Sequence, residues 1–363
     1  MKAVVLRHGD LVVTDIPEPP LGPGQLLVQP LAVGICGSDL SARQHTGEFL
    51  AAHREAGVDG ALFDSGRDVV FGHELTGRVV RVGVGVTDFH PGQNLVILPM
   101  VIGTDGVMHT LGYANDYPGG LAERIVVQAY GHLPIPDSVS PYLAAVTEPM
   151  ATGLNAVLRS GIQAGAAAVV TGCGPVGLGA VVDLAYRGIH PIIASDPSAQ
   201  RREIAKAYGA DIVVDPAQQD PLTVYRDQTA TARELFVFEA SAASGLLDRL
   251  MAAVPPFTRI LVVGAGMTRE SIRTVTGVLK NVSIEFVGGP GKNEDRYIAL
   301  DQMFAHLVEG RFDPAAMVTG YAGLDSVAEV FDALRPRNAA AIEHVKILVR
   351  PDVTQRGIVP NSL

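Results

Sequence analysis

Three short segments of the sequence carry residue types that bind metals: GICGSD at 34–39, FGHE at 71–74 and TEPM at 147–150. Together they offer a thiolate, an imidazole and two carboxylates, a mixture that suits zinc with an open coordination position. Each segment also has a simpler explanation, because a lone cysteine is commonly a small buried side chain, a His-Glu pair is often a surface feature, and Glu-Pro commonly begins a helix. The spacing leaves open whether the three segments meet.

A fourth segment, TGCGPVGLG at 171–179, has the composition of a phosphate-binding loop. It contains G-x-G-x-x-G after a run typical of a buried strand and at the start of a helical pattern. There the first glycine permits a tight turn, the second lets backbone approach a pyrophosphate, and the third allows helix and strand to pack closely. The helix N-terminus adds free N–H groups and a partial positive charge. The residues expected at the phosphates are Gly172, Gly174, Pro175, Val176 and Gly177.

Asp196 ends the next strand-like run, nineteen residues beyond Gly177. A carboxylate at this place accepts hydrogen bonds from a ribose diol and repels a 2′-phosphate, which favours NAD. NADP is the alternative, because Arg201 and Arg202 lie one helical turn further on and are in reach of such a phosphate. A purely structural explanation also stands, in which the glycines make a tight turn and Asp196 caps the helix that follows. The glycine motif, its place between a strand and a helix, and Asp196 together favour the dinucleotide site.

The elements that must position these residues change in character along the chain. Up to about residue 150, short β-type runs alternate with clusters of Gly, Pro and Asp, which indicates a mostly antiparallel, barrel-like unit. These runs are 3–6, 11–15, 25–33, 75–82, 94–99 and 122–127. The first part of the chain is therefore expected to be predominantly β.

From about residue 151, strands alternate with helical patterns, which predicts βαβ units and a doubly wound parallel sheet as far as about residue 289. The strands expected are 167–171, 192–195, 212–214, 235–239 and 259–263, and the helices 151–160, 176–187, 200–208 and 246–254. After a GGPG turn at 288–291 come helical patterns at 296–309 and 324–334 and a strand at 344–349. These last elements either stand alone or return to complete the first domain. The fold class predicted is α/β.

The bulk composition excludes several kinds of partner. The 363 residues are 47% hydrophobic and 18% charged with a net charge of −10, so no basic field attracts nucleic acid or an anionic membrane. The apolar stretch 164–184 contains a cluster of glycines and fits a strand, turn and helix better than a membrane span. With no signal-peptide pattern and two cysteines, Cys36 and Cys173, a cytoplasmic location is expected.

In this order the motifs resemble those of the zinc-containing medium-chain dehydrogenase/reductase superfamily, and within it the threonine and sorbitol dehydrogenase branch. The likeness covers nearly the whole chain. It rests on G-I-C-G-S-D, G-H-E, Pro91 with Gly92, Gly119 and Gly120 followed by Ala122 and Glu123, T-E-P-M-A, the glycine loop and Asp196. The resemblance implies a GroES-like catalytic domain at 1–150 completed by 290–363, a Rossmann dinucleotide-binding domain at 151–289, and an active site in the cleft.

The same resemblance assigns roles in a zinc site. The family's zinc ligands carry over onto Cys36, His73 and Glu148, with Glu74 as either a direct ligand or a nearby carboxylate that exchanges with water. Ser38 matches the hydroxyl that contacts the substrate oxygen, so Cys36, His73 and Ser38 are the expected catalytic residues. Relatives often hold a second, structural zinc on four closely spaced cysteines. The segment of this chain expected to match, residues 97–119, contains no cysteine. One zinc per chain is expected.

The reaction implied is hydride transfer between an alcohol and NAD. Zinc as a Lewis acid lowers the pKa of the alcohol, Ser38 accepts the departing proton, and the carbinol carbon releases hydride to the nicotinamide. The backbone at Val263, Gly264 and Ala265 matches the segment that holds the nicotinamide amide. The T-E-P-M-A motif favours secondary alcohols or polyols as substrates, with an aromatic or long-chain primary alcohol as the alternative. The family leads us to expect a homodimer or homotetramer.

Two features depart from the family pattern. Ser41 stands where many relatives carry a proton-relay histidine, so the relay is expected to run through Ser38 and water, with His45 as a weaker alternative. The stretch between Cys36 and His73 is longer than usual and has a helix-like insert at 48–63, which either shapes the substrate pocket or elaborates the surface.

Two other functions compete with the zinc alcohol dehydrogenase. One is a zinc-free quinone or enoyl reductase on the same scaffold, whose members generally lack the set formed by Cys36, His73 and Glu148. The other is a non-catalytic nucleotide-binding protein. Metal analysis separates the first of these from the main prediction, and turnover of an alcohol with NAD separates the second.

Overall fold

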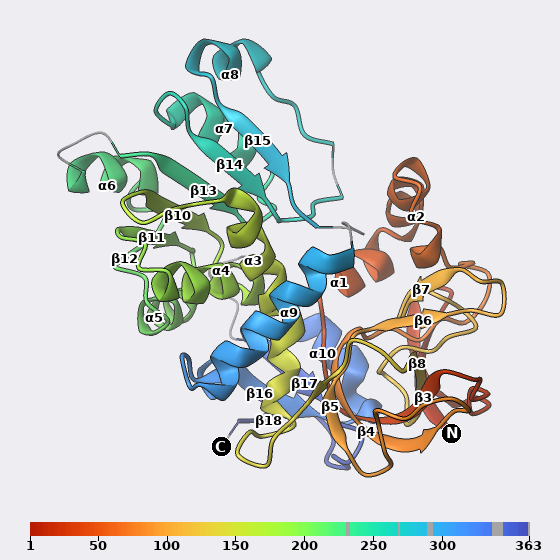
Figure 1. The fold of residues 1–363 in the computed structure, drawn as a ribbon. Coiled ribbons are helices and arrows are strands. Elements are labelled where there is room, and N and C mark those ends of the chain that lie inside the picture. Colours follow the sequence, from red (N-terminus) through yellow and green to blue (C-terminus); the bar gives the residue numbers. More distant parts are fainter. Residues whose placement is uncertain (230–232, 268, 289–292, 336–343, 362–363) are drawn as a thin grey trace. The chain divides into compact units, whose positions relative to one another are not determined.

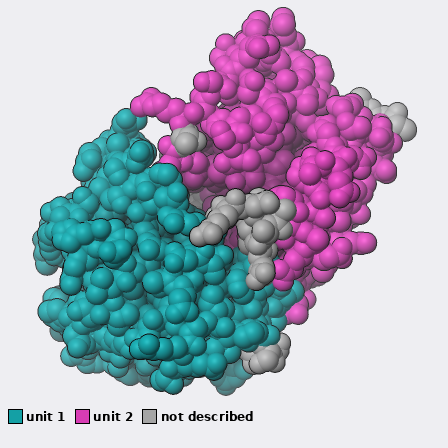
Figure 2. Space-filling view, turned by 180° about the vertical axis from the view of Figure 1, so that it is seen from behind, with its two compact units in different colours: residues 1–148, 314–335, 344–363 teal, residues 149–313, 336–343 magenta. Residues whose placement is uncertain are grey.

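A computed structural model describes residues 1–229, 233–267, 269–288, 293–335 and 344–361 (Figure 1). These residues divide into two compact units, coloured separately in Figure 2. Unit 1 consists of residues 1–148, 314–335 and the described residues from 344 onward, and unit 2 of residues 149–313. Most of the predicted turn at 288–291 lies outside the described residues.

Unit 1 is built on a mostly antiparallel sheet that joins distant parts of the chain. Its strands run in the order β18, β16, β17, β3, β4, β5, β9, with β8 also paired to β3. Their bounds are β3 Gln25–Gly34, β4 Glu74–Val82, β5 Asn94–Val96, β8 Ile125–Gln128, β9 Leu133–Pro134, β16 Val318–Ala322, β17 Lys346–Val349 and β18 Val359–Pro360. Because β17 pairs with the end of β3, a C-terminal strand lies directly beside the N-terminal metal-binding motif.

Shorter elements surround this sheet. Two hairpins are formed by β1 with β2 and by β6 with β7. Their bounds are β1 Lys2–Arg7, β2 Asp10–Asp15, β6 Met100–Ile102 and β7 Met108–Thr110. The helices are α1 Gly37–Gln44, α2 Thr46–Glu55, η1 Asp59–Ala61, η2 Leu143–Val146, η3 Pro314–Ala316, η4 Leu324–Ser326 and α10 Val327–Ala333. The predicted helical insert at 48–63 is therefore α2 followed by a turn, because Gly57 adopts a positive φ of 68° just after the helix.

Unit 2 contains a parallel sheet with the strand order β12, β11, β10, β13, β14, β15. The bounds are β10 Ala167–Thr171, β11 Ile192–Ser195, β12 Ile212–Val214, β13 Leu235–Glu239, β14 Arg259–Val262 and β15 Ser283–Phe286. The order reverses between β10 and β13, which is the switch point where doubly wound sheets bind nucleotides. The predicted doubly wound α/β fold is thus confirmed.

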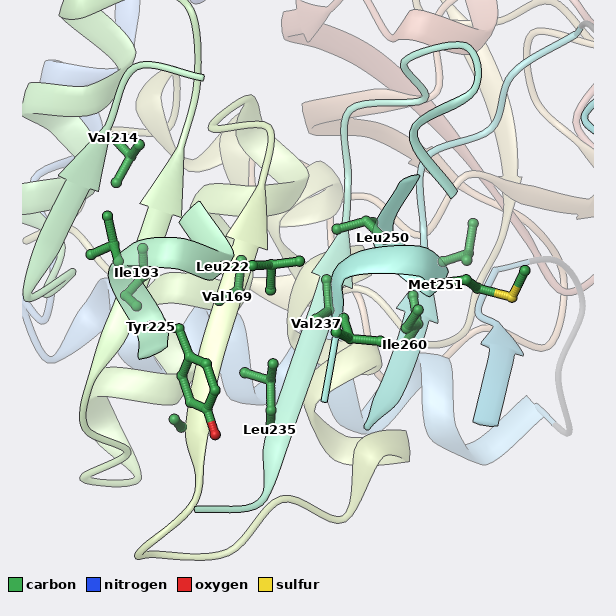
Figure 3. Close-up of a cluster of buried hydrophobic side chains, with 14 residues drawn as sticks. Val169, Ile193, Val214, Leu222, Tyr225, Leu235, Val237, Leu250, Met251 and Ile260 are labelled. Atoms are coloured by element: carbon green, nitrogen blue, oxygen red, sulfur yellow. The ribbon is translucent and has the colours of Figure 1, made fainter. Parts of the chain in front are cut away.

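Helices cover this sheet. Their bounds are α3 Thr147–Ser160, α4 Pro175–Tyr186, α5 Ala199–Ala207, α6 Pro221–Gln228, α7 Leu246–Ala253, α8 Thr274–Lys280 and α9 Asn293–Val308. Figure 3 shows one face of the sheet, where Leu222 and Tyr225 of α6 and Leu250 and Met251 of α7 lie against alternate strand residues such as Val237. Alternation along each strand sends the intervening residues to the opposite face. The apolar stretch at 164–184 forms a strand, a turn and most of a helix, as predicted.

The predicted domain boundary near residue 289 differs from the end of unit 2 at residue 313. Helix α9 belongs with unit 2 because His306 lies 3.2 Å from Asp183 of α4 and packs on Tyr186. Further along, the Tyr208 hydroxyl donates to the carbonyl oxygen of Asp313 at 2.6 Å. In the described part of the chain, no helix is both long and apolar enough to cross a membrane.

Candidate metal centre and dinucleotide site

The pairing of β3 with β4 brings two metal-binding motifs together. Gly34, the last residue of β3, pairs with Glu74, the first residue of β4. Cys36 follows β3 by two residues and His73 precedes β4 by one, so strand register alone places them side by side. A side chain at position 34 would overlap the Glu74 carboxylate, which explains the glycine there.

Cys36, His73 and Glu74 form a group that fits a metal ion. Among the described residues, each of these three offers a ligand atom, and the three atoms lie within 4.8 Å of one another. His73 and Glu74 are buried and Cys36 is half-buried. One thiolate, one imidazole and one carboxylate make a donor set that zinc prefers. The residues present therefore fit the metal predicted from the sequence.

Asp39 orients the residues of this group. Its Oδ2 accepts the N–H of Cys36 at 3.0 Å, and its Oδ1 lies 3.4 Å from Nδ1 of His73. Carboxylates beside metal-binding histidines fix the orientation of the ring and raise its basicity. Burial by itself lowers the pKa of His73, but the charges of Asp39 and Cys36 outweigh it and hold that pKa well above 6.5. Since a histidine ligand must be neutral, a metal ion competes with a proton here.

Glu74 is tied to a buried cation that the sequence analysis missed. Lys346 on β17 donates from Nζ to Glu74 Oε2 at 2.6 Å and to the carbonyl oxygen of Ile35 at 3.0 Å. Both charged side chains are buried. The pair fixes one carboxylate oxygen of Glu74 and leaves the other for a metal ion. The sequence does mark Lys346, because it is the one charged residue in the otherwise apolar strand KILV.

Ser38 and Asp39 share a second missed partner, Tyr113. The Tyr113 hydroxyl oxygen lies 2.8 Å from Ser38 Oγ and 3.0 Å from Asp39 Oδ1. Its ring packs against Phe49, Phe71 and His73, with centroids 5.1, 6.1 and 5.3 Å away. Burial, together with the Asp39 charge, raises the pKa of Tyr113 well above 10. No local sequence pattern marks this tyrosine.

The other predicted residues of this region are not members of the group of three. Glu148 is buried in the first turn of α3 and is not a member of the group. Ser41 is half-buried on α1, and His45 is exposed at the end of that helix. The segment 97–119 carries the hairpin of β6 and β7.

The glycine loop of unit 2 has the geometry that a phosphate-binding turn needs. Gly172 has a φ of +88°, which favours glycine, and Gly174 caps α4 with Pro175 as the first helical residue. A side chain at Gly177 would overlap the carbonyl oxygen of Gly172. A Cβ at Gly174 would instead meet no atom closer than Nη1 of Arg201 at 3.9 Å, so this position is open to a ligand. Val176 follows in the first turn of α4.

Asp196 connects the glycine loop to the end of β11. Its Oδ2 accepts the N–H of Cys173 and its Oδ1 accepts the N–H of Ser198, both at 2.8 Å. The cap of α5 is Ser198, whose side chain accepts the N–H of Arg201. The helix-capping explanation of Asp196 therefore does not hold. Arg202 donates to the carbonyl oxygen of Asp196 at 2.7 Å.

A cavity of about 690 Å³ opens beside these residues, entirely within unit 2. Its lining includes Gly174, Asp196, Arg201, Arg249 and Leu250. In the part of the chain that the structure describes, Nε of Arg201 is buried without a hydrogen-bond partner. The cavity lies at the carboxyl ends of β10 and β11, where doubly wound sheets bind ligands.

The predicted nicotinamide segment follows β14. The N–H groups of Val263 and Gly264 both donate to the carbonyl oxygen of Glu239, at 2.8 and 2.9 Å. Ala265 is exposed. Those two N–H groups are therefore used within the fold, and a carboxamide NH₂ group bound at this segment would need a carbonyl oxygen as its acceptor.

Comparison with known proteins identifies the family of the chain. Residues 22–137 match the family model of the alcohol dehydrogenase GroES-like domain, and residues 175–305 match that of the zinc-binding dehydrogenases. The (R,R)-butanediol dehydrogenase of Neisseria gonorrhoeae is 29% identical over 359 residues, covering 96% of this chain and 98% of its own. The L-threonine 3-dehydrogenase of Thermococcus kodakarensis is 28% identical over 347 residues, with coverages of 92% and 94%.

Solved structures give the same picture. The crystal structure of 2R,3R-butanediol dehydrogenase from Bacillus subtilis matches with a TM-score of 0.79 and 28% identity, covering 97% of this chain and 99% of that one. The chain belongs to the zinc-dependent medium-chain dehydrogenase/reductase family. It is an oxidoreductase of the alcohol dehydrogenase class that uses zinc and a nicotinamide dinucleotide. The predicted family, the GroES-like and Rossmann fold and the reaction class are confirmed.

Proposed function

We propose that this enzyme oxidises a secondary alcohol or polyol to the ketone, with NAD as hydride acceptor and one zinc ion per chain. The observation that carries the proposal is the group formed by Cys36, His73 and Glu74. The substrate class is supported by relatives named for butanediol and for position 3 of threonine, where the hydroxyl is on a secondary carbon. We assign the catalytic domain to unit 1 and the dinucleotide domain to unit 2.

We assign the zinc ligands to Cys36 and His73, with Glu74 and Glu148 as the carboxylates that complete the set. Glu74 is supported by its place in the group, and Glu148 by its burial and by the TEPM motif. Bound there, zinc supplies a Lewis acid that lowers the pKa of an alcohol oxygen. Lys346 offsets one negative charge of this site, which contains one thiolate as well as carboxylates, because its Nζ contacts Glu74 Oε2.

The protein residues around the alcohol then have defined tasks. Ser38 Oγ accepts the hydrogen bond of the alcohol. It takes up the alcohol proton as its own proton passes on to water, while hydride leaves the carbon. Asp39 holds the backbone of Cys36 by a hydrogen bond, and its carboxylate lies beside the ring of His73. The carbonyl oxygens of Val263 and Gly264 bind the nicotinamide carboxamide, which fixes the face of the ring that receives hydride.

The preference for NAD is assigned to Asp196. Each of its oxygens accepts one backbone N–H and retains a lone pair for a ribose hydroxyl, and its charge repels a 2′-phosphate. Arg201 lines the same cavity and favours binding of the pyrophosphate beside Gly174. Gly172, Gly177, Pro175 and Val176 complete the phosphate-binding turn.

We also propose that the enzyme is a cytoplasmic homodimer formed through unit 2. Strand β15 is the edge of the parallel sheet, and an edge strand pairs readily with a second copy of itself about a two-fold axis. Apolar side chains beside this edge support the proposal, since Val278, Leu279 and Phe286 are 73%, 78% and 73% exposed. Such an apolar patch is typical of an interaction surface.

The insert at 48–63 is assigned to the wall of the substrate site. Its helix α2 buries Phe49 against the ring of Tyr113, which in turn contacts Ser38 and His73. Deleting residues 51–60 is expected to change the order of substrate preference. An unchanged order would assign the insert to the surface.

The proposed function is tested by a spectrophotometric panel of secondary alcohols, polyols and primary alcohols with NAD and NADP. The protein used must have a measured zinc content. We expect about one zinc per chain and turnover of secondary alcohols or vicinal diols with NAD. Zinc-free protein that reduces quinones or enones would support the alternative reductase instead, and two zinc ions per chain would contradict the single site.

A further inference from the structure

We propose that Tyr113 is a positioning residue that holds the Ser38 hydroxyl as a hydrogen-bond acceptor for the alcohol. The proposal rests on the proposed function, because it deepens the role given there to Ser38. It starts from a contact that no motif marks: one phenol oxygen lies within hydrogen-bond distance of both Ser38 Oγ and Asp39 Oδ1.

Counting protons fixes the direction of these two hydrogen bonds. A phenol has one proton to donate, and a carboxylate accepts only. Tyr113 therefore donates its hydroxyl proton to Asp39 Oδ1 at 3.0 Å, where the negative charge of the carboxylate strengthens the hydrogen bond. The Ser38 hydroxyl is left to donate its own proton to the Tyr113 oxygen at 2.8 Å.

This direction decides what Ser38 offers to a substrate. With its proton held by Tyr113, the remaining lone pairs of Ser38 Oγ accept a hydrogen bond from an incoming alcohol. A free serine hydroxyl would rotate and spend part of the time as a competing donor. Tyr113 thereby removes an unproductive orientation before the substrate binds, which is a gain in preorganisation.

The phenol is itself held firmly. Tyr113 is 5% exposed, and its ring is enclosed by Phe49, Phe71 and His73. Phe49 comes from α2, where the carbonyl oxygen of Phe49 contacts Nδ1 of His53 at 2.8 Å and the two rings lie 4.1 Å apart. The insert therefore supports the ring that orients Ser38.

The sequence around Ser38 shows why such a partner is useful. Ser41, the next hydroxyl-bearing residue in the chain, is one turn from Ser38 on the same short helix. The hydroxyl of Tyr113 reaches Ser38 from a segment 75 residues away in the chain. It thus gives Ser38 a defined hydrogen-bond partner from outside α1.

The test compares Tyr113→Phe with Tyr117→Phe, which removes a hydroxyl that accepts the N–H of Thr104 in the same segment. Tyr113→Phe keeps the packed ring, so we expect zinc content, Tm and the Kd for NADH to match those of the control. We expect kcat to fall about tenfold with a smaller change in KM. We also expect the NAD complex to bind trifluoroethanol, measured by calorimetry, about tenfold more weakly, while imidazole binds unchanged.

A double-mutant cycle with Ser38→Ala separates positioning from a general loss of structure. If Tyr113 acts through Ser38, the double variant has the kcat of Ser38→Ala alone. If the losses in kcat from the two substitutions multiply in the double variant, the positioning role of Tyr113 is wrong. It is also wrong if Tyr113→Phe leaves kcat and trifluoroethanol affinity unchanged. In both cases the proposed dehydrogenase function stands. A zinc-loaded wild-type protein that turns over no alcohol would overturn the proposed function and the role of Tyr113 with it.

Discussion

Lys346 Nζ lies 2.6 Å from Glu74 Oε2, and only 5% and 2% of these two side chains are exposed. The two residues are far apart in the chain and meet because β17 and β4 flank β3 in the sheet. The pair fixes the orientation of a carboxylate in the metal group. Both the stability of unit 1 and the shape of the metal site therefore depend on a strand near the C-terminus.

Replacing Lys346 by Met leaves the Glu74 carboxylate buried without its cation. Breaking a buried pair in this way costs about 3 to 5 kcal/mol of unfolding free energy. Urea unfolding followed by far-UV circular dichroism measures the loss, since the sequence has no tryptophan. Lys2→Met is the control, because Lys2 and Asp325 form an exposed pair worth about 1 kcal/mol or less. If both variants lost the same unfolding free energy, a group other than Lys346 would be compensating the charge of Glu74.

Replacing Cys36 by Ser removes the thiolate from the metal group. We expect most of the zinc and most of the alcohol dehydrogenase activity to be lost, while NADH binding by unit 2 is retained. Cys173→Ser is the matched control, since that cysteine is buried in the glycine loop of unit 2. Zinc analysis by mass spectrometry and NADH titration separate the two effects. A Cys36→Ser enzyme with the wild-type rate would show that Cys36 is not a ligand.

Replacing Asp196 by Ala removes both the ribose acceptor and the carboxylate that holds the Cys173 N–H. We expect the Kd for NADH to rise about tenfold or more, and the preference for NAD over NADP to shrink. Ser198→Ala is the control, because it removes the cap of α5 at a cost of about 1 kcal/mol and leaves Asp196 in place. Fluorescence titration of the wild type and Asp196→Ala with NADH and with NADPH gives the four Kd values, and the control is titrated in the same way. If NADPH binds the wild-type protein as tightly as NADH does, Asp196 does not set the preference.

Local patterns were enough to predict most of the sheet of unit 2. The runs at 192–195, 212–214 and 235–239 coincide with β11, β12 and β13, because these strands are rich in apolar and β-branched residues between turns. Strand β15 was missed because it lies at the edge of the sheet and carries a mixed pattern, SIEF, with no fully buried residue. Helix α1 was missed because it buries only Asp39 and Ala42 and has no apolar stripe.

For the metal group, the sequence predicts the ligand motifs but not their meeting in space. Cys36, His73 and Glu74 stand in recognisable motifs, but their meeting depends on the pairing of Gly34 with Glu74, which no single segment encodes. Lys346 and Tyr113 reach the group from other elements, so their roles arise only from the tertiary fold. Long-range contacts of this kind carry no periodic signal in the sequence.

Introducing charge beside the β15 edge tests the proposed dimer. Leu279→Glu places a carboxylate in the exposed apolar patch of α8, where it would be buried at the cost of desolvation if two copies met there. We expect the mass measured by light scattering to fall from that of a dimer to that of one chain. Val84→Glu is the control, because Val84 is 82% exposed in unit 1. A wild-type protein with the mass of one chain, or a Leu279→Glu dimer, would contradict this interface.

His132 gives the fold a pH dependence that is independent of the metal. Its Nδ1 accepts the N–H of Leu98 at 3.0 Å, and its Nε2 lies 2.7 Å from the carbonyl oxygen of Gln128, so the buried ring is held neutral. Burial lowers the pKa of His132 to about 4. The unfolded chain, whose histidine pKa is about 6.5, therefore binds more protons than the folded chain between those two values.

Stability from this residue is complete above about pH 6.5 and is lost as the pH falls toward 4. Between pH 7 and pH 5 the loss assigned to His132 is about 2 kcal/mol of unfolding free energy. His132→Asn lowers stability at pH 7 but removes this part of the pH dependence, because the asparagine does not titrate. Urea unfolding of both proteins at the two pH values gives the difference. Parallel pH profiles for the wild type and the variant would show that protonation of His132 is not coupled to folding.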